Sequence, residues 1–452
     1  MEGATIDQLL TAMIRSADQV SDLLFLQGKP PLVESNGRLQ DFAIDTPDSR
    51  VTAELVDGIA EHIIAGNQRL LEMYATTGSC DTSYEVPGIA RLRVNIYKQN
   101  NGRAIVMRKF PSEIPDLDKL GLPRVFREIV KEKNGIVFVT GATGSGKTTT
   151  LAAMLNYLNQ TEPIHVLTLE DPIEYQYPIG VAAISQRELG RDFESFAHGL
   201  RVALRQAPKG ILLGEIRDRE TMEIAMTASE TGHIVYTTLH TVNAGQTINR
   251  ILGFFNRDEE EQIRYRLADS IRYIVSQRLI PSLSGARLLL TEVVGSGLRT
   301  REAIRYGESE GKMFHDIIEA ATPSDWHTFD QGLLRYLQAG HISDETALLY
   351  CNQKGKMQRE IDTWRKRAGT EQAGADSGLK MDAIAPPKLA AAQAAAFAAP
   401  PPEPGTPGIV SAPEMPALKM APRITVPKNP APAPAGPTSP SHAVSPGQAA
   451  SP

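Results

Sequence analysis

The sequence has few cysteines, no excess of positive charge and no long apolar run, and each of these shortages narrows the range of functions. Cys80 and Cys351 are its two cysteines, and they lie in no metal-ligand spacing. We therefore expect both to be reduced, unreactive thiols of a cytosolic protein. The formal net charge is −6, which argues against a nucleic-acid partner.

Membrane-spanning and secretory segments are also missing. No apolar run approaches the ~18–20 residues that cross a bilayer. The first residues, Met1–Asp7, lack the basic region and the continuous apolar core of a signal peptide. We therefore expect a cytoplasmic protein without direct membrane insertion, whose action at a membrane would depend on a partner.

Proline is abundant in the last part of the chain. Of the 31 prolines, 18 fall in residues 381–452, among alanine, glycine and serine. Such a segment has too little apolar surface to offset the entropy of ordering it. Residues 368–452 are therefore predicted to form a Pro/Ala-rich disordered tail, with a docking ligand for a proline-binding partner as the alternative.

The residues before the tail predict two folded domains. Residues 1–110 combine helical stripes with alternating runs, which indicates a small α+β domain. These segments are Ile6–Ile14, Val51–Ile64, Ala90–Tyr97 and Arg103–Arg108, with shorter strand-like runs at Asp22–Leu26 and Pro31–Val33. Residues 111–123 contain three prolines and are predicted to be the linker to the next domain.

Residues 124–367 alternate between strand-like and helix-like segments, which is the pattern of a parallel sheet in an α/β domain. The predicted strands are Gly135–Thr140, His165–Glu170, Gly210–Leu213 and His233–Leu239. The acidic run Asp258–Glu261 is expected to open a long helix. The apolar face of that helix would consist of Ile263, Leu267, Ile271, Ile274 and Leu279, and helical patterns continue to about Arg367.

A glycine-rich motif follows the first of these strands. Residues Gly141–Thr148 match G-x-x-x-x-G-K-[ST] and precede a helix-forming run at Thr149–Asn159. Such a loop brings backbone N–H groups and a helix N-terminus against phosphate oxygens. This strand–helix context favours a P-loop over a chance glycine-rich turn, and it predicts binding of ATP with Mg²⁺. The predicted nucleotide-binding residues are Gly141, Ala142, Thr143, Gly144, Ser145, Gly146, Lys147, Thr148 and Thr149, with Lys147 at the β/γ-phosphates and Thr148 as a metal ligand.

Acidic residues end two of the predicted strands. Glu170 belongs to the run Leu167–Glu174, and Glu215 belongs to the run Ile211–Asp218. The carboxyl ends of parallel strands meet at one edge of the sheet, so both clusters are expected beside the P-loop. Each cluster alone would be interpreted as solvated surface charge. Two of them downstream of a P-loop favour a role at the metal ion and the attacking water.

A histidine stands at each end of the fourth predicted strand. His240 ends it and is a candidate to bond or sense a γ-phosphate. His233 begins it, about 23 Å away by strand geometry, and is interpreted as a structural residue.

Together these motifs, in this order, resemble the secretion and type IV pilus ATPase superfamily, and within it the branch that retracts pili in twitching motility. The resemblance spans about residues 5–365 and rests on a Walker A motif, an Asp box, a Walker B motif and a His box. These are Gly141–Thr148, Thr168–Glu174, Leu213–Glu215 and Gly232–Thr241, and Val275–Pro281 and Thr328–Gln331 also look like this family.

The resemblance implies a fold, an assembly and residue roles. It implies a RecA-like P-loop ATPase domain preceded by a PAS-like domain, in a homo-hexameric ring that acts on an inner-membrane pilus platform protein. Glu215 would polarise the attacking water, Glu170 would assist at the Mg²⁺ and water site, and His240 would contact the γ-phosphate. Arg93 and Arg108 would reach nucleotide across the ring; from the residues alone they would be strand-surface charges.

The chain also departs from the family pattern. Ala207-Pro208-Lys209 stands where the family often has two acids around the proline, Ser21–Phe25 lacks a histidine, and Ala303-Ile304-Arg305 is all that remains of a longer retraction signature. An accessory retraction motor and a type IV secretion motor are therefore alternatives. From other classes, the alternatives are a nucleotide-binding scaffold that no longer hydrolyses and a nucleic-acid motor.

Overall fold

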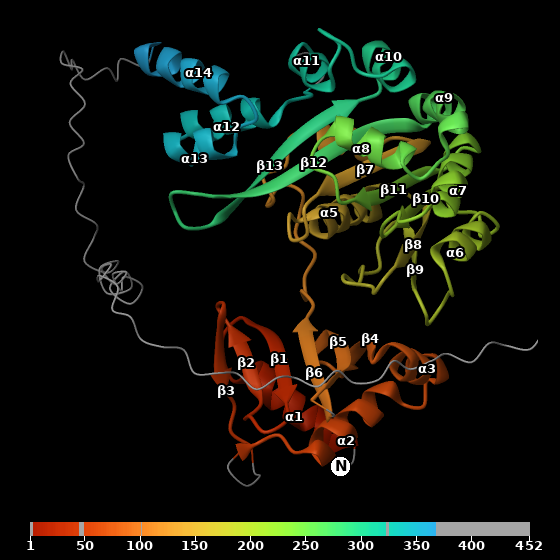
Figure 1. Cartoon of the computed structure of the whole chain (residues 1–452), viewed down its shortest axis with the longest axis vertical. Helices are drawn as coiled ribbons and strands as arrows, with labels where there is room; N and C mark the ends of the chain where they lie inside the picture. Colours follow the sequence, from red (N-terminus) through yellow and green to blue (C-terminus); the bar gives the residue numbers. More distant parts are fainter. Residues whose placement is uncertain (1–2, 45–48, 101, 322–324, 368–452) are drawn as a thin grey trace, which may run out of the picture. The chain divides into compact units, whose positions relative to one another are not determined.

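The computed structural model describes residues 3–44, 49–100, 102–321 and 325–367 (Figure 1). The predicted tail, residues 368–452, lies outside the described residues. Among the described helices, none is both long enough and apolar enough to cross a membrane.

The amino-terminal region is built on a six-stranded antiparallel sheet in the order β3-β2-β1-β6-β5-β4. Its elements are α1 (Gly3–Arg15), β1 (Val20–Leu26), β2 (Leu32–Ser35), β3 (Arg38–Asp41), α2 (Ala53–Ile64), α3 (Gln68–Thr77), β4 (Ser79–Val86), β5 (Ala90–Gln99) and β6 (Gly102–Lys109). Asn36 and Gly37 both have positive φ, 52° and 76°, as a two-residue hairpin turn requires. The α+β prediction is confirmed, although α3 and β4 were not predicted. The likeness to PAS domains stays a prediction.

The chain then runs through residues 110–124, which contain neither helix nor strand, into a seven-stranded sheet in the order β13-β12-β7-β11-β10-β8-β9. Its strands are β7 (Gly135–Gly141), β8 (His165–Glu170), β9 (Ala183–Glu188), β10 (Gly210–Leu213), β11 (Ile234–Leu239), β12 (Ile271–Pro281) and β13 (Arg287–Gly295). All neighbours are parallel except β12 and β13. The helices between and before the strands are α4 (Val125–Val130), α5 (Lys147–Thr161), α6 (Phe196–Ala203), α7 (Arg219–Glu230), α8 (Ala244–Leu252) and α9 (Glu260–Ser270).

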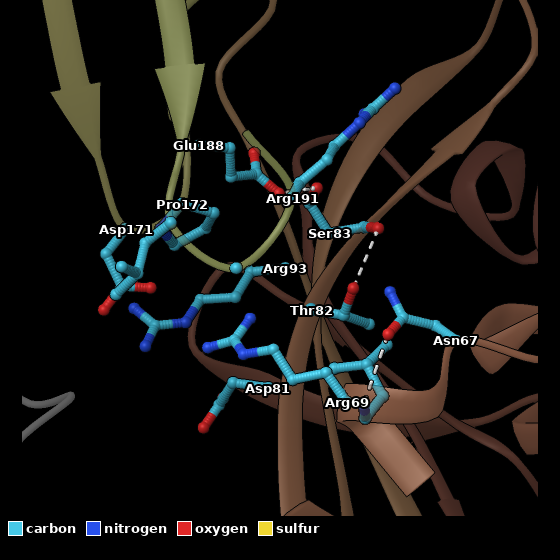
Figure 2. A pocket seen from close by; sticks show the side chains of 13 residues that line it. Asn67, Arg69, Asp81, Thr82, Ser83, Arg93, Asp171, Pro172, Glu188 and Arg191 are labelled. Carbon is cyan, nitrogen blue, oxygen red and sulfur yellow. Dashed lines mark hydrogen bonds between the residues drawn. The ribbon is translucent and has the colours of Figure 1, made fainter. Parts of the chain in front are cut away.

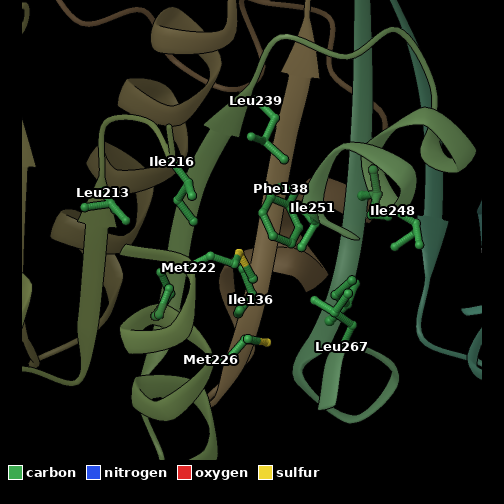
Figure 3. Packing of buried hydrophobic residues seen from close by; sticks show 14 of the residues in the cluster. Ile136, Phe138, Leu213, Ile216, Met222, Met226, Leu239, Ile248, Ile251 and Leu267 are labelled. Carbon is green, nitrogen blue, oxygen red and sulfur yellow. The ribbon is translucent and has the colours of Figure 1, made fainter. Parts of the chain in front are cut away.

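The core of this sheet explains why its strands are so apolar. Every residue of β7, β10 and β11 is buried. Helices α7 and α8 and the end of α9 pack their apolar residues over one face, around Phe138, Leu239 and Leu267 (Figure 3). A second cluster, which includes Leu155 of α5 and Tyr236, covers the other face. Parallel strands covered on both faces read as continuous hydrophobic runs.

The predicted long helix from Asp258 is wrong in its second half. Helix α9 ends at Ser270, and Ile271, Ile274 and Leu279 lie on strand β12 beside the P-loop strand. The spacing of four residues continues across the boundary, so the helical period gave no sign of the change. Strands β9, β12 and β13 were all missed by the prediction.

The carboxyl-terminal helices are α10 (Leu298–Tyr306), α11 (Phe314–Glu319), α12 (Phe329–Gln338), α13 (Asp344–Tyr350) and α14 (Lys354–Arg367). The family-like stretch Thr328–Gln331 is a capping box at the start of α12, in which Thr328 accepts from the Gln331 N–H and Gln331 accepts from the Thr328 N–H. Asp330 accepts from the backbone N–H groups of Asn352 and Gln353 at 2.7 and 3.0 Å. These residues therefore have a structural role in joining α12 to the chain before α14.

Candidate active site

The P-loop turns between the end of β7 and the start of α5. Gly144 and Gly146 have φ values of 79° and 89°, in the left-handed region that favours glycine. The Lys147 ammonium donates to the carbonyl oxygens of Gly141 and Ala142 at 2.9 and 3.1 Å. Burial lowers the pKa of Lys147, and the nearby carboxylate of Glu215 opposes that shift. The lysine is therefore held over the loop by neutral acceptors.

This loop fits a phosphate group. The Ser145 hydroxyl is buried and has no hydrogen-bond partner among the described residues, an arrangement that costs free energy unless a ligand or water satisfies it. Lys147 has only carbonyl partners, which anionic phosphate oxygens would outcompete. Backbone N–H groups at the start of α5 add the partial positive charge of a helix N-terminus.

One pocket brings together most of the predicted site residues, although they come from segments far apart in the sequence. Those that line it are Arg93, Arg108, Thr143, Gly144, Gly146, Lys147, Thr148, Thr149, Glu170, Glu215 and His240. Of the other predicted residues, Gly141 and Ala142 accept hydrogen bonds from the pocket-lining Lys147 through their carbonyl oxygens. Ser145 is buried within the loop. The P-loop strand, the two acidic strand ends and the His box strand thus meet at one edge of the sheet.

Glu215 follows β10 and is bonded to an arginine and a histidine. Its carboxylate pairs with Arg217 and lies 3.3 Å from Nε2 of His240. Burial raises the pKa of Glu215, but Arg217 and His240 more than offset that effect, so the net shift is downward. The carboxylate therefore stays ionised and able to accept a hydrogen bond from water. His240 thus contacts Glu215 within the pocket, and its bond to a γ-phosphate stays a prediction.

Glu170 at the end of β8 lies in a different environment. Its side chain is buried, and its Oε1 accepts from the Thr168 hydroxyl at 2.6 Å and from the Gln186 amide at 3.2 Å. Burial raises the pKa of Glu170 to about 7, despite these hydrogen bonds. Near neutral pH this carboxyl is therefore partly protonated, which makes it a weaker metal ligand than an ionised one.

The sequence reasoning missed Glu174, four residues further along the Asp box. It lines the same pocket as Thr148, the predicted metal ligand, and faces the charges of Arg93 and Arg108. Burial raises the pKa of Glu174, while Thr148 and the two arginines act in the opposite direction. Glu174 had been quoted as part of the motif, but no spacing rule distinguished it from Glu170.

The two arginines come from paired positions of β5 and β6 in the amino-terminal sheet. Arg108 donates from Nε to Asp22 at 2.8 Å. Arg93 lies beside Asp171 in a second pocket that adjoins the first (Figure 2). The resemblance implied delivery across a ring, but here both arginines line the pocket of their own chain. Phe110 and Pro111, directly after β6, line it too, so the amino-terminal sheet reaches the P-loop through its own linker.

Two other expectations concern the opposite edge of the sheet. His233 precedes β11, and its Nδ1 is 3.1 Å from the carbonyl of Ala228, which fits the predicted structural role. Lys209 precedes β10, whereas Glu215 follows it. The exchange of acid for base at Ala207-Pro208-Lys209 suggested a change near the site; this is wrong, because the whole of β10 separates Lys209 from the pocket-lining residues.

The site offers few fixed ligands to a metal. Among the residues that the structure describes, there is no group of three or more His, Cys, Asp or Glu side chains that could hold one. The Thr148 hydroxyl with Glu174 nevertheless suits Mg²⁺, which keeps several waters and takes further oxygens from substrate phosphates.

Comparison with known proteins gives consistent relatives. The family model described as type II/IV secretion system protein matches residues 83–305. A twitching motility protein of Neisseria gonorrhoeae is 38% identical over 318 residues, which are 70% of this chain and 83% of the relative. The type IV pilus retraction ATPase PilT of Pseudomonas aeruginosa is 37% identical over 327 residues, 72% of this chain and 93% of the relative. The type IV pilus ATPase PilU of the same organism is 33% identical over 377 residues, 83% and 96% of the two chains.

Solved structures agree with these relatives. A crystal structure of the pilus retraction motor PilT with bound ADP matches with a TM-score of 0.69 and 36% identity, over 78% of this chain and 99% of that one. The ATPase DotB of Legionella pneumophila matches with a TM-score of 0.66 and 29% identity, over 76% and 95% of the two chains. The predicted fold, a P-loop ATPase of this type after a small α+β region, is confirmed.

Proposed function

Because the chain belongs to the type II/IV secretion system protein family, we propose that it is an ATPase motor that powers the retraction of type IV pili. The observation that carries this proposal is the single pocket in which the P-loop, both acidic strand ends, His240 and two arginines of the amino-terminal sheet meet. A pocket shared by the two sheets gives nucleotide a direct way to change how one sheet lies against the other.

The residues divide the chemistry between them. The loop amides, Ser145 and Lys147 bind and orient the phosphates of the substrate. Glu215, held ionised by Arg217 and His240, accepts a proton or a hydrogen bond from the attacking water. Arg93 and Arg108 stabilise the charge that develops on the transferred phosphoryl group.

Mg²⁺ would be held by Thr148 together with Glu174, and Glu170 would assist from the buried end of β8. When bound, this ion supplies charge neutralisation at the phosphate oxygens. Glu174 also faces the charges of Arg93 and Arg108, so its carboxylate offsets their positive charge before the substrate arrives.

The proposed assembly is a homo-hexameric ring at the cytoplasmic face of the inner membrane, where it acts on a pilus platform protein. Hydrolysis would move the amino-terminal sheet against the ATPase sheet, and the ring would pass that movement to the platform. The relative named a pilus retraction motor supports this choice, and so does the acidic balance of the chain, which is poorly suited to nucleic acid.

A second candidate function is that of an accessory pilus motor. It is favoured by the longer stretch, 377 residues, over which the chain matches the type IV pilus ATPase PilU. The test is to delete the gene and image pili while measuring twitching. Long, unretracted pili and lost twitching support the retraction motor, whereas pili that still retract support the accessory role, and cells without pili contradict both.

Hydrolysis itself is tested with the purified chain. Release of phosphate from ATP that needs Mg²⁺ and stops in Lys147→Ala supports the proposal. Nucleotide binding without turnover would instead identify a scaffold, and stimulation by DNA would identify a nucleic-acid motor.

A further inference from the structure

One buried ion pair joins the amino-terminal sheet to the ATPase sheet next to the proposed active site. Arg91 lies on β5, and Glu188 ends β9. Their side chains form a salt bridge and are 13% and 7% exposed. Ser83 of β4 donates to Glu188 at 2.7 Å and accepts from Arg91 at 2.9 Å. Figure 2 shows Ser83 and Glu188, which both line the pocket beside this contact.

The pair holds a specific piece of backbone. Arg91 donates to the carbonyl oxygen of Ile173 at 2.8 Å, and Glu188 accepts from the N–H of the same residue at 3.2 Å. Both polar backbone groups of Ile173 are therefore bonded to the two ends of one salt bridge. Ile173 directly precedes Glu174, which lines the nucleotide pocket together with Thr148.

The neighbours of the pair also belong to the site. The Arg91 guanidinium lies 5.8 Å from the centre of the Phe110 ring, and Phe110 lines the nucleotide pocket. Arg91 and Glu174 together line a smaller adjoining pocket. Nothing here touches the phosphate-binding loop itself, so the pair is placed to act on the position of Glu174 and not on nucleotide affinity.

We propose that Arg91 and Glu188 are positioning residues for ATP hydrolysis: they clamp Ile173 and thereby fix Glu174 beside Thr148 when the amino-terminal sheet contacts the ATPase sheet. This inference rests on the proposed ATPase function and deepens it. The clamp draws Arg91 and Ser83 from one sheet and Glu188 and Ile173 from the other. Separation of the sheets therefore removes the Arg91 bond to the Ile173 carbonyl and leaves Glu188 without its cationic partner, so hydrolysis is linked to sheet contact.

A purely structural salt bridge would give a different result from a positioning clamp. Loss of Arg91 should lower kcat about 10²-fold, the size expected when a reacting group is misplaced, while the KM for ATP and the Kd for a fluorescent ADP change little. The matched control is Arg103→Ala. Arg103 lies on β6 of the same sheet and forms an ion pair with Asp57 of α2 at 3.1 Å, and it bonds to neither Glu188 nor Ile173. The variant should keep kcat.

A double-variant cycle tests whether Arg91 acts through Glu174. Arg91→Ala should add little to the loss already caused by Glu174→Gln, because effects of residues that act as a unit are not additive. Losses that simply multiply would overturn the proposal. Since breaking a buried pair also destabilises a protein, Arg91→Lys and Glu188→Gln serve as milder variants. Each keeps part of the clamp, and intermediate kcat values at an unchanged melting temperature are expected.

Hydrogen exchange gives a measurement that does not depend on turnover. Peptides covering residues 171–177 should exchange at least about tenfold faster in Arg91→Ala and Glu188→Gln than in the parent, because the Ile173 amide loses its acceptor or its order. Arg103→Ala should leave these peptides unchanged. If the parent chain does not hydrolyse ATP, the proposed function fails while faster exchange still supports the clamp. Unchanged exchange would disprove the clamp even in an active ATPase.

Discussion

The two edges of the seven-stranded sheet carry the same kinds of residue in different states. At the carboxyl edge, Glu170 is buried with a raised pKa, Glu215 is bonded to Arg217 and His240, and the Ser145 hydroxyl has no partner. At the amino edge, His165 is already satisfied within the chain, with its two ring nitrogens bonded to the Gln206 carbonyl and to the Ser185 hydroxyl. The carboxyl edge therefore keeps polar groups that a ligand can engage, whereas the amino-edge histidine has both ring nitrogens occupied by bonds within the chain.

Among variants at the carboxyl edge, those of the two pocket arginines should lower kcat the most. Arg93→Ala and Arg108→Ala should each lower kcat about 10³-fold, the lower end of what an arginine at a transferring phosphoryl group contributes. Because both line the pocket of their own chain, a ring that mixes Arg93→Ala with Lys147→Ala subunits should stay inactive.

Measured phosphate release from mixed and unmixed rings checks this prediction. Recovery of activity on mixing would show that the arginines act between subunits, as the resemblance implied. Arg103→Ala, on the strand next to Arg93, is the control and should hydrolyse like the parent.

The carboxylate of Glu215 should give the next largest effect. Glu215→Gln keeps the shape of the side chain but removes its negative charge, so kcat should fall about 10²-fold. Binding of a fluorescent nucleotide should be retained, since Glu215 lies outside the P-loop. A Gln variant that turns over like the parent would mean that another carboxylate, such as Glu174, positions the water.

The contrast between the edges also shows how far sequence reasoning reached. The strands whose carboxyl ends form the site were predicted from apolar runs next to acidic or glycine-rich ends. Of these, β8 and β10 were predicted with their correct bounds. Strand β12 was missed because Ile271 and Ile274 continue the spacing of α9. A continuous apolar run satisfies the periods of helix and strand alike.

Within the site, the residues that sequence could find were those fixed by a local motif. Lys147, Thr148, Glu170, Glu215 and His240 follow this rule. Glu174 needs the chain to turn back after β8, and Arg91 needs contact between residues 97 positions apart. No period or spacing along the sequence encodes such contacts, because they depend on how two separate sheets meet.

The buried carboxyl of Glu170 should make the stability of the folded protein depend on pH. Its folded-state pKa of about 7 lies above the ordinary value of 4.5, so the folded protein holds this proton more tightly than the unfolded chain does. Its contribution to stability is full below about pH 4.5 and is lost as the pH rises through about 7. Glu170→Gln should therefore flatten the melting temperature across this window. Burial also raises the pKa of Glu292 to about 7, so this residue should contribute a pH dependence of the same sign.

Melting curves between pH 4.5 and 8 check this prediction. The control is Glu215→Gln, since the pKa of Glu215 is lowered and its titration lies below the window. An equal pH dependence in the parent and Glu170→Gln would mean that Glu170 is ionised in the folded protein.

The smallest effects are expected at the amino edge. Lys209→Asp restores an acid where the family often has one, on an exposed side chain before β10, and stability should change by less than about 0.5 kcal/mol. His233→Ala removes the contact with the Ala228 carbonyl and should cost about 1 kcal/mol, the usual net value of one hydrogen bond. Both variants should keep kcat within about twofold, because neither side chain lines the pocket. A much larger loss of kcat in either variant, at an unchanged melting temperature, would show that the amino edge communicates with the site and that the contrast between the edges is incomplete.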